Sequence, residues 1–90
     1  MQRPVQDLTD HERGCISHAL GLNRNRVPFR NHFAAEPGSP DDDVFVELER
    51  RGLARLFSKP FGIVTCNTWR VTAAGVRAIG AGDHAERIAS

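Results

Sequence analysis

The sequence predicts a single α+β domain made of three helices, a two-stranded hairpin and a closing C-terminal helix. A capping box at Thr9–Glu12 opens a segment with the apolar spacing of a helix. The stretch 41–57, DDDVFVELERRGLARLF, has the pattern of a helix that ends at Gly52 and turns at once into a strand. A turn at 58–62 then separates two strand-like runs, as in a hairpin.

The first helix follows a leader that we expect at residues 1–8. Its helical spacing puts Glu12, Cys15, Ile16, Ala19 and Leu20 on one face. A glycine at position 21 should end the helix in a left-handed conformation. We expect the domain itself to cover residues 9–82 and a C-terminal tail to cover residues 83–90.

The middle of the chain predicts two further helical segments. Phe29 and Phe33 are spaced i, i+4, so we expect a short helical turn over Phe29–Ala35. Two prolines and a glycine make residues 36–40 a loop. Ser39 or Asp41 should cap the central helix, whose acidic start and basic end suit the helix dipole.

The last third predicts the hairpin and the closing helix. We expect strands at Leu53–Phe57 and Ile63–Thr72, with Trp69 and Val71 facing the core. Thr72 is placed to cap the final helix, which should direct Val76 and Ile79 inward. The resulting order of elements is that of a winged helix-turn-helix domain, in which the hairpin is the two-stranded wing.

Several motifs resemble a group of small uncharacterised proteins of bacteriophages and prophages. They are LTDHERGCISHALGL, RVPFRNHFAAEPGS, VELERRGLARL and WRVTAAGVRAI, and the match spans Leu8 to Ile79. The group commonly has YRNHF, so Phe29 here replaces a tyrosine. The second half is also similar to winged-helix regulators of the MarR kind. This resemblance implies a winged-helix-like fold and a phage setting, and it implies no activity.

Composition and charge restrict the kinds of partner. The formal net charge of +1 excludes both a strongly basic nucleic-acid coat and an acidic mimic of DNA. Cys15 and Cys66 lack a CxxC partner, so we expect reduced core thiols; a disulfide between them would need an oxidising compartment. No apolar run approaches the roughly 18 residues of a membrane span, and the N-terminus lacks a signal-peptide core. We therefore expect a soluble, cytoplasmic protein without membrane contact, in the host cytoplasm if a phage encodes it.

Two groups of side chains have the spacing of reactive sites. His11, Cys15 and His18 form one stripe on the first helix that could ligate a metal. We favour the alternative, a core cysteine with histidines at its rim, because no paired ligands follow downstream. A thiol nucleophile at Cys15 or Cys66 would need an orienting group and a pocket, and no glycine-rich oxyanion element accompanies either one. We expect no enzyme activity and no cofactor.

A polar segment between the first two helices is a candidate binding loop. It alternates cations with amide donors, as contacts to phosphates or bases would. The same pattern also suits a solvated loop or a protein-binding surface. The candidate residues are Arg24, Arg26, Arg30, Asn31 and His32.

The central helix occupies the position of a recognition helix, but its charges oppose DNA. Its first turns carry Asp41, Asp42, Asp43 and Glu47, which DNA phosphates would repel. We expect these carboxylates to face a basic protein partner. The predicted function is a non-catalytic module, monomer or homodimer, that binds a host or phage protein, for example as an anti-CRISPR inhibitor. A DNA-binding transcriptional regulator is the alternative, and a small zinc or thiol enzyme is a remote third.

Overall fold

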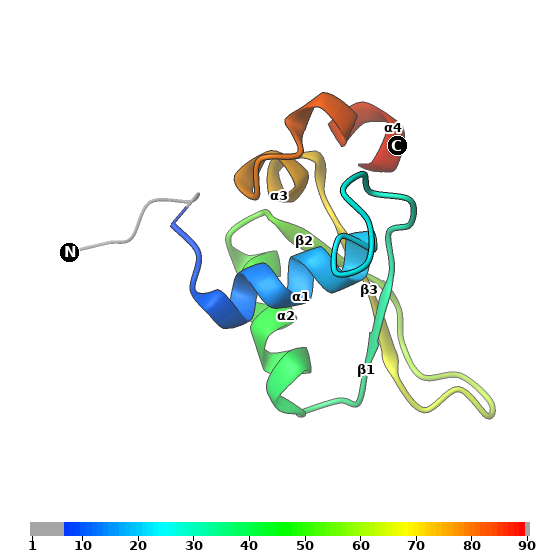
Figure 1. Cartoon of the computed structure of the whole chain (residues 1–90). Coiled ribbons are helices and arrows are strands. Elements are labelled where there is room, and N and C mark those ends of the chain that lie inside the picture. The colour runs from blue at the N-terminus through cyan, green and yellow to red at the C-terminus, as the bar shows by residue number, and fades with distance from the viewer. Residues whose placement is uncertain (1–6, 90) are drawn as a thin grey trace.

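A computed structural model describes residues 7–89 and has an α+β fold (Figure 1). The predicted leader, residues 1–8, lies outside the described residues except for Asp7 and Leu8. No helix within residues 7–89 is long and apolar enough to cross a bilayer. The elements in order are α1 (Asp10–Leu20), β1 (Phe33–Ala35), α2 (Pro40–Arg50), β2 (Ala54–Ser58), β3 (Asn67–Val71), α3 (Ala73–Ala78), the 3-10 helix η1 (Gly82–His84) and α4 (Ala85–Ala89).

Helix α1 begins and ends where the sequence predicts. The Thr9 side chain accepts a hydrogen bond from the Glu12 amide at 3.1 Å, and the Glu12 carboxylate accepts one from the Thr9 amide at 2.8 Å. Gly21 ends the helix with a φ of 82°. A side chain at Gly21 would also overlap the ring of Phe29. The left-handed conformation therefore favours glycine there, and the missing side chain leaves room for the Phe29 ring.

Helix α2 is fixed against α1 by a buried ion pair. Ser39 caps α2 by accepting from the Asp42 amide at 3.2 Å, and Pro40 occupies the first turn. At the other end of α2, Arg51 Nη1 lies 3.2 Å from Glu12 Oε2, and both side chains are more than nine-tenths buried. Losing either partner would leave a buried charge uncompensated, so this contact holds the two helices in one arrangement.

The sheet has one strand more than the hairpin that we predicted. The expected helical turn at Phe29–Ala35 is wrong, because Phe33–Ala35 is strand β1 and pairs antiparallel with β3. The register places Phe33 opposite Trp69, and the strand order is β1-β3-β2. The i, i+4 spacing of two phenylalanines is local, whereas the pairing that decides this segment is with a distant strand.

The β2–β3 hairpin is confirmed, with a shorter return strand than predicted. Ala54 pairs with Val71 and Leu56 with Trp69, and a bulge follows Leu56. Strand β3 begins at Asn67, so residues 63–66 belong to the connection rather than to the strand. In Figure 1 this connection projects away from the helices, at the opposite end of the sheet from α3 and α4.

The core lies between α1, α2, the sheet and the C-terminal helices. Phe33, Phe45 and Trp69 form an aromatic stack, with ring centroids 4.9 and 5.7 Å apart. The fully buried side chains include Phe45, Ile16, Leu20, Leu48, Leu53, Val71 and Val76.

Helix α3 packs closely on the chain that enters β2. Thr72 caps it by accepting from the Gly75 amide, as predicted. A Cβ at Gly75 would overlap the carbonyl oxygen of Leu53, so the glycine permits this close approach. After Gly82, where we predicted a tail, η1 and α4 continue the fold and bury Ala85.

Candidate functional site

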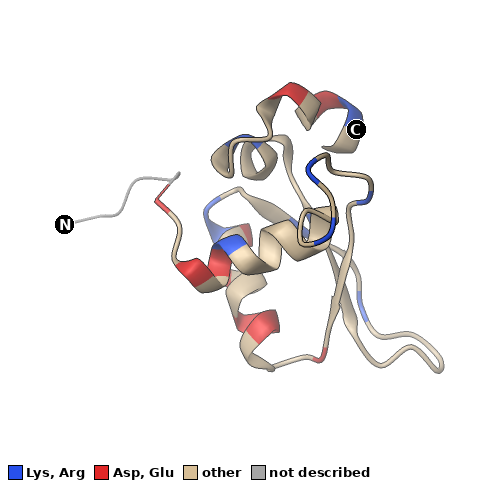
Figure 2. Ribbon diagram, viewed as in Figure 1, with Lys and Arg blue, Asp and Glu red and all other residues tan. Residues whose placement is uncertain are grey.

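The acidic start of α2 does not form one uniform face. Figure 2 shows acidic residues at the beginning of this helix and arginines in the loop after α1. Asp43 is exposed, and Glu47 forms an ion pair with Arg50 at 2.7 Å. Asp41 and Asp42, by contrast, form hydrogen bonds with other residues of the protein.

Asp42 is a buried structural carboxylate, which corrects its prediction as part of an exposed acidic face. It is 5% exposed, and its Oδ1 accepts from Asn67 Nδ2 at 3.0 Å and from Trp69 Nε1 at 2.9 Å. Its Oδ2 accepts from the Gly38 amide at 3.0 Å. Burial by itself raises the pKa of Asp42, but these hydrogen bonds to the charged form outweigh it and lower the pKa. The residue joins the loop before α2 to β3.

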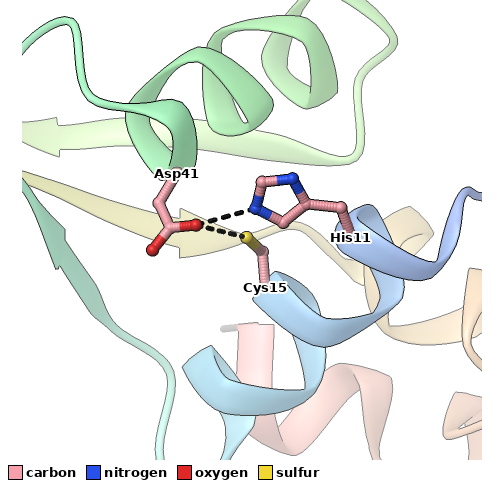
Figure 3. A group of neighbouring side chains, drawn as sticks. All are labelled: His11, Cys15 and Asp41. Atoms are coloured by element: carbon pink, nitrogen blue, oxygen red, sulfur yellow. Dashed lines mark hydrogen bonds and ion pairs between the residues drawn. The ribbon is translucent and has the colours of Figure 1, made fainter.

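Asp41 brings together two side chains of α1. Its Oδ1 lies 2.8 Å from His11 Nε2 and accepts from the Cys15 thiol at 3.6 Å (Figure 3). His11 and Cys15 are thus neighbours, as their i, i+4 spacing predicts. The third member of the predicted stripe, His18, instead forms a T-shaped contact with Phe33, with ring centroids 5.1 Å apart. The group seen in the structure therefore contains the Asp41 carboxylate of α2 in place of the predicted His18.

The Cys15 thiol is held in its neutral form. Burial, the charge of Asp41, the hydrogen bond to Asp41 and the charge of Glu12 together raise its pKa to about 12. A nucleophilic cysteine needs the opposite shift. Cys66 is the other free cysteine and is partly exposed.

A surface pocket of about 340 Å³ opens beside this cluster. The side chains of His11, Cys15 and Asp41 contribute to its wall, and His18 lies on the same wall. The pocket therefore gives an ion or small molecule access to the three donor atoms.

The predicted polar loop divides into structural and exposed residues. Arg30 donates to the His18 carbonyl through Nε and Nη2, at 3.2 and 2.8 Å, and so closes the end of α1. Asn31 donates to the Val71 carbonyl at 2.9 Å and accepts from the Val71 amide at 2.8 Å. Both residues thus act within the fold, whereas the remaining loop candidates Arg24, Arg26 and His32 are exposed.

The end of β2 and the connection from β2 to β3 expose an apolar cluster that we did not predict as a site. We call it the hairpin tip and define it as Phe57, Phe61, Ile63 and Val64, which are 49%, 86%, 99% and 51% exposed. Two hydrogen bonds of 2.9 Å between Phe61 and Val64 close the turn. The signal was present in the sequence, since FSKPFGIV carries large apolar side chains in a turn region that is usually polar.

Two arginines form a cross-strand pair near the base of the hairpin, and one of them contacts Phe57 of the tip. Arg55 and Arg70 face each other across β2 and β3, and the Arg70 guanidinium lies 3.7 Å from the centre of the Phe57 ring. The Nε of Arg70 is buried and has no hydrogen-bond partner within residues 7–89. Like charges opposite one another on a strand pair are unfavourable, so this pair of arginines would be stabilised by an anionic group from outside the chain.

Comparisons with known proteins provide no relative from which a function could be transferred. Neither the protein-family models nor the curated proteins nor the solved structures contain a significant match to this chain.

Proposed function

We propose that this protein is a non-catalytic module that binds a protein partner through the hairpin tip. The observation that carries the proposal is the exposure of Phe61 and Ile63, at 86% and 99%. Transfer of a Phe or Ile side chain from water into an interface contributes about 1.5–3 kcal/mol each. A projecting pair of this kind is suited to fill a pocket on a partner, as the anchoring residues of protein interfaces do.

The tip is also ordered before binding. The hydrogen bonds between Phe61 and Val64 and the contact of Arg70 with the Phe57 ring restrict the hairpin. Less conformational freedom is then lost on association than with a disordered loop. We therefore propose the hairpin as the binding surface, rather than the acidic start of α2, where Asp42 is buried.

The Arg55–Arg70 pair indicates the charge of the partner. Arg70 contacts Phe57 of the hairpin tip and its cross-strand neighbour Arg55 is exposed, so the two favour carboxylates around the partner's pocket. Charge complementarity of this kind raises the association rate and selects the orientation of the partner more than it increases the binding affinity. We infer an acidic rim around an apolar pocket.

The arrangement of elements supports a winged-helix-like fold as part of the proposal. Two helices precede a hairpin wing, and β1 completes a three-stranded sheet. The phage setting implied by the sequence motifs remains part of the proposal as well. A stoichiometric inhibitor of a host defence protein, of the anti-CRISPR kind, is one form that such a module would take.

DNA binding is the alternative that the exposed cations favour. Arg24 and Arg26 in the loop and Arg55 on β2 are all exposed. Against it, Asp43 remains exposed at the start of α2, and Glu47 lies one turn further along this helix. In a winged helix that binds DNA, this helix end would face phosphates, which repel carboxylates.

Site-specific photo-crosslinking tests the proposal on the full chain. A photoreactive amino acid at Phe61 or Ile63, expressed in a bacterial host, should give a discrete adduct that protease digests and nuclease leaves intact. The same group at Glu36, an exposed loop position, is the control and should give no such adduct. Nuclease-sensitive adducts from the tip would favour the regulator instead, and a lack of adducts at both tip positions would refute tip-mediated binding.

A further inference from the structure

We propose that His11, Cys15 and Asp41 form a binding site for a zinc-like divalent cation, separate from the hairpin tip. These residues offer one nitrogen, one sulfur and one oxygen donor, and the three atoms lie within 4.8 Å of one another. Imidazole and thiolate are the ligands that zinc prefers, whereas magnesium and calcium prefer sites made of oxygen atoms alone.

Two helices with fixed ends deliver the donors. His11 and Cys15 lie one turn apart on the same face of α1. Asp41 lies in the first turn of α2, whose start is set by the Ser39 cap. The buried Glu12–Arg51 pair holds these two helices together, so the cluster does not depend on a mobile loop.

Two of the three donor–donor distances lie near those of a zinc tetrahedron, and the third, between the His11 nitrogen and Cys15 Sγ, is at most 4.8 Å. Ligand bonds of about 2.0–2.3 Å place tetrahedral donors roughly 3.3–3.8 Å apart. The Cys15 Sγ to Asp41 Oδ1 distance of 3.6 Å falls in this range. His11 Nε2 is closer to the same oxygen, at 2.8 Å, and must move outward by at least about 0.5 Å. The His11 side chain is 52% exposed, so it has room to do so.

Both contacts now converge on one oxygen atom, Asp41 Oδ1 (Figure 3). A cation between the three donors would replace both hydrogen bonds by metal–ligand bonds. The pocket of about 340 Å³ leaves the fourth position open, so we assign a water there. Three protein ligands and one open position are the pattern of accessible zinc sites.

The protonated thiol is the main energetic cost of binding. Burial and the nearby Asp41 carboxylate raise the pKa of Cys15 to about 12, and the metal-bound form must be the thiolate. A divalent cation reverses this situation, because its charge offsets the carboxylate and stabilises the deprotonated sulfur. Metal binding therefore releases a proton.

Cobalt(II) is the probe that tests the site, because cobalt–thiolate bonding gives a near-ultraviolet charge-transfer band. Titration of the reduced full chain should produce this band with one equivalent bound, and zinc should abolish it by competition. The Cys66→Ser variant, which keeps Cys15, is the matched thiol control and should behave as the wild type. Cys15→Ser should lose the band.

The Asp41→Asn and His11→Gln variants should remain folded, because both side chains are about half exposed, and they therefore test the site even if Cys15→Ser misfolds. Each should weaken cobalt and zinc binding by at least about tenfold, the loss seen even for supporting residues of metal sites. His32→Gln, an exposed histidine elsewhere, should have no effect. A folded wild-type chain without the cobalt band would overturn the proposal. Binding that survives Asp41→Asn but fails in His18→Gln would overturn the assignment of Asp41.

Discussion

The base and the tip of the β2–β3 hairpin place similar side chains in opposite environments. At the base, Ala54, Trp69 and Val71 are at most 2% exposed, while Phe61 and Ile63 at the tip are 86% and 99% exposed. Large apolar residues at the base stabilise the fold, whereas Phe61 and Ile63 bury too little surface to contribute much to it. Hydrophobicity at the tip therefore calls for an explanation outside the folding of this chain, which the proposed partner supplies.

The base is also where polar and apolar contacts reinforce each other. Trp69 stacks on Phe45 with an interplanar angle of 15°, and its Nε1–H donates to the buried carboxylate of Asp42. Asn67 donates to the same carboxylate oxygen. A tryptophan is well suited to this position because it combines a large apolar surface with one hydrogen-bond donor.

Truncation at the base should have the largest effect. Trp69→Ala is expected to lower the free energy of unfolding by about 3–5 kcal/mol, as large aromatic deletions in cores do. Urea denaturation followed by circular dichroism measures this loss. Because a loss of that size approaches the whole stability of a small domain, Trp69→Phe offers a milder test, with an expected loss of about 1–3 kcal/mol.

The exposed Phe61 provides the matched aromatic control for Trp69. Phe61→Ala should leave the free energy of unfolding within about 0.5 kcal/mol of the wild type. Equal losses in Phe61→Ala and Trp69→Ala would show that the tip packs as the base does, and would remove the contrast between the two ends.

Two neighbouring aspartates, one buried and one exposed, should differ by an intermediate amount in their contribution to the free energy of unfolding. Asp42→Asn removes a charge that accepts hydrogen bonds from the base of the hairpin, and should lower the free energy of unfolding by about 1.5–3 kcal/mol. Asp43→Asn, at the exposed adjacent position, should change it by less than about 0.5 kcal/mol. Denaturation of both variants at neutral pH measures the difference.

The contribution of Asp42 should also depend on pH. Its pKa is lower in the folded protein than its usual value of 3.8, so its stabilising effect is complete above that value and is lost as the pH falls toward the folded-state pKa. The gap between wild type and Asp42→Asn should therefore narrow below about pH 4. A gap that stays constant down to pH 2 would contradict the role of the charge.

Local signals in the sequence predicted where α1, α2 and α3 begin. The capping box of α1, the Ser39 cap of α2 and the Thr72 cap of α3 each depend on residues that are close in sequence. Strand β1 was missed because it is defined by pairing with Trp69 and its neighbours in β3. A three-residue strand has too short a pattern to reveal that pairing by itself.

The candidate sites were predicted only in part, because they too depend on residues that are distant in sequence. The helical spacing of His11 and Cys15 was informative, but the third donor, Asp41, comes from another helix. Three successive aspartates looked equivalent in sequence, although the positions of Asn67 and Trp69 decide that only Asp42 is enclosed. Tertiary contacts, which one sequence does not display, account for both differences.

The smallest effect on stability is expected at the tip itself. The double variant Phe61→Ser, Ile63→Ser should unfold with a free energy within about 0.5 kcal/mol of the wild type, because both side chains are in water already. Its retention on a hydrophobic-interaction column should nevertheless fall clearly. The control, Val27→Ser with Val46→Ser, removes apolar groups that are only 50% and 52% exposed and should reduce retention less. A loss of more than about 1 kcal/mol in the tip variant would mean that the tip is covered in the free protein, by a second copy or by the chain itself, and is not a surface kept for a different protein.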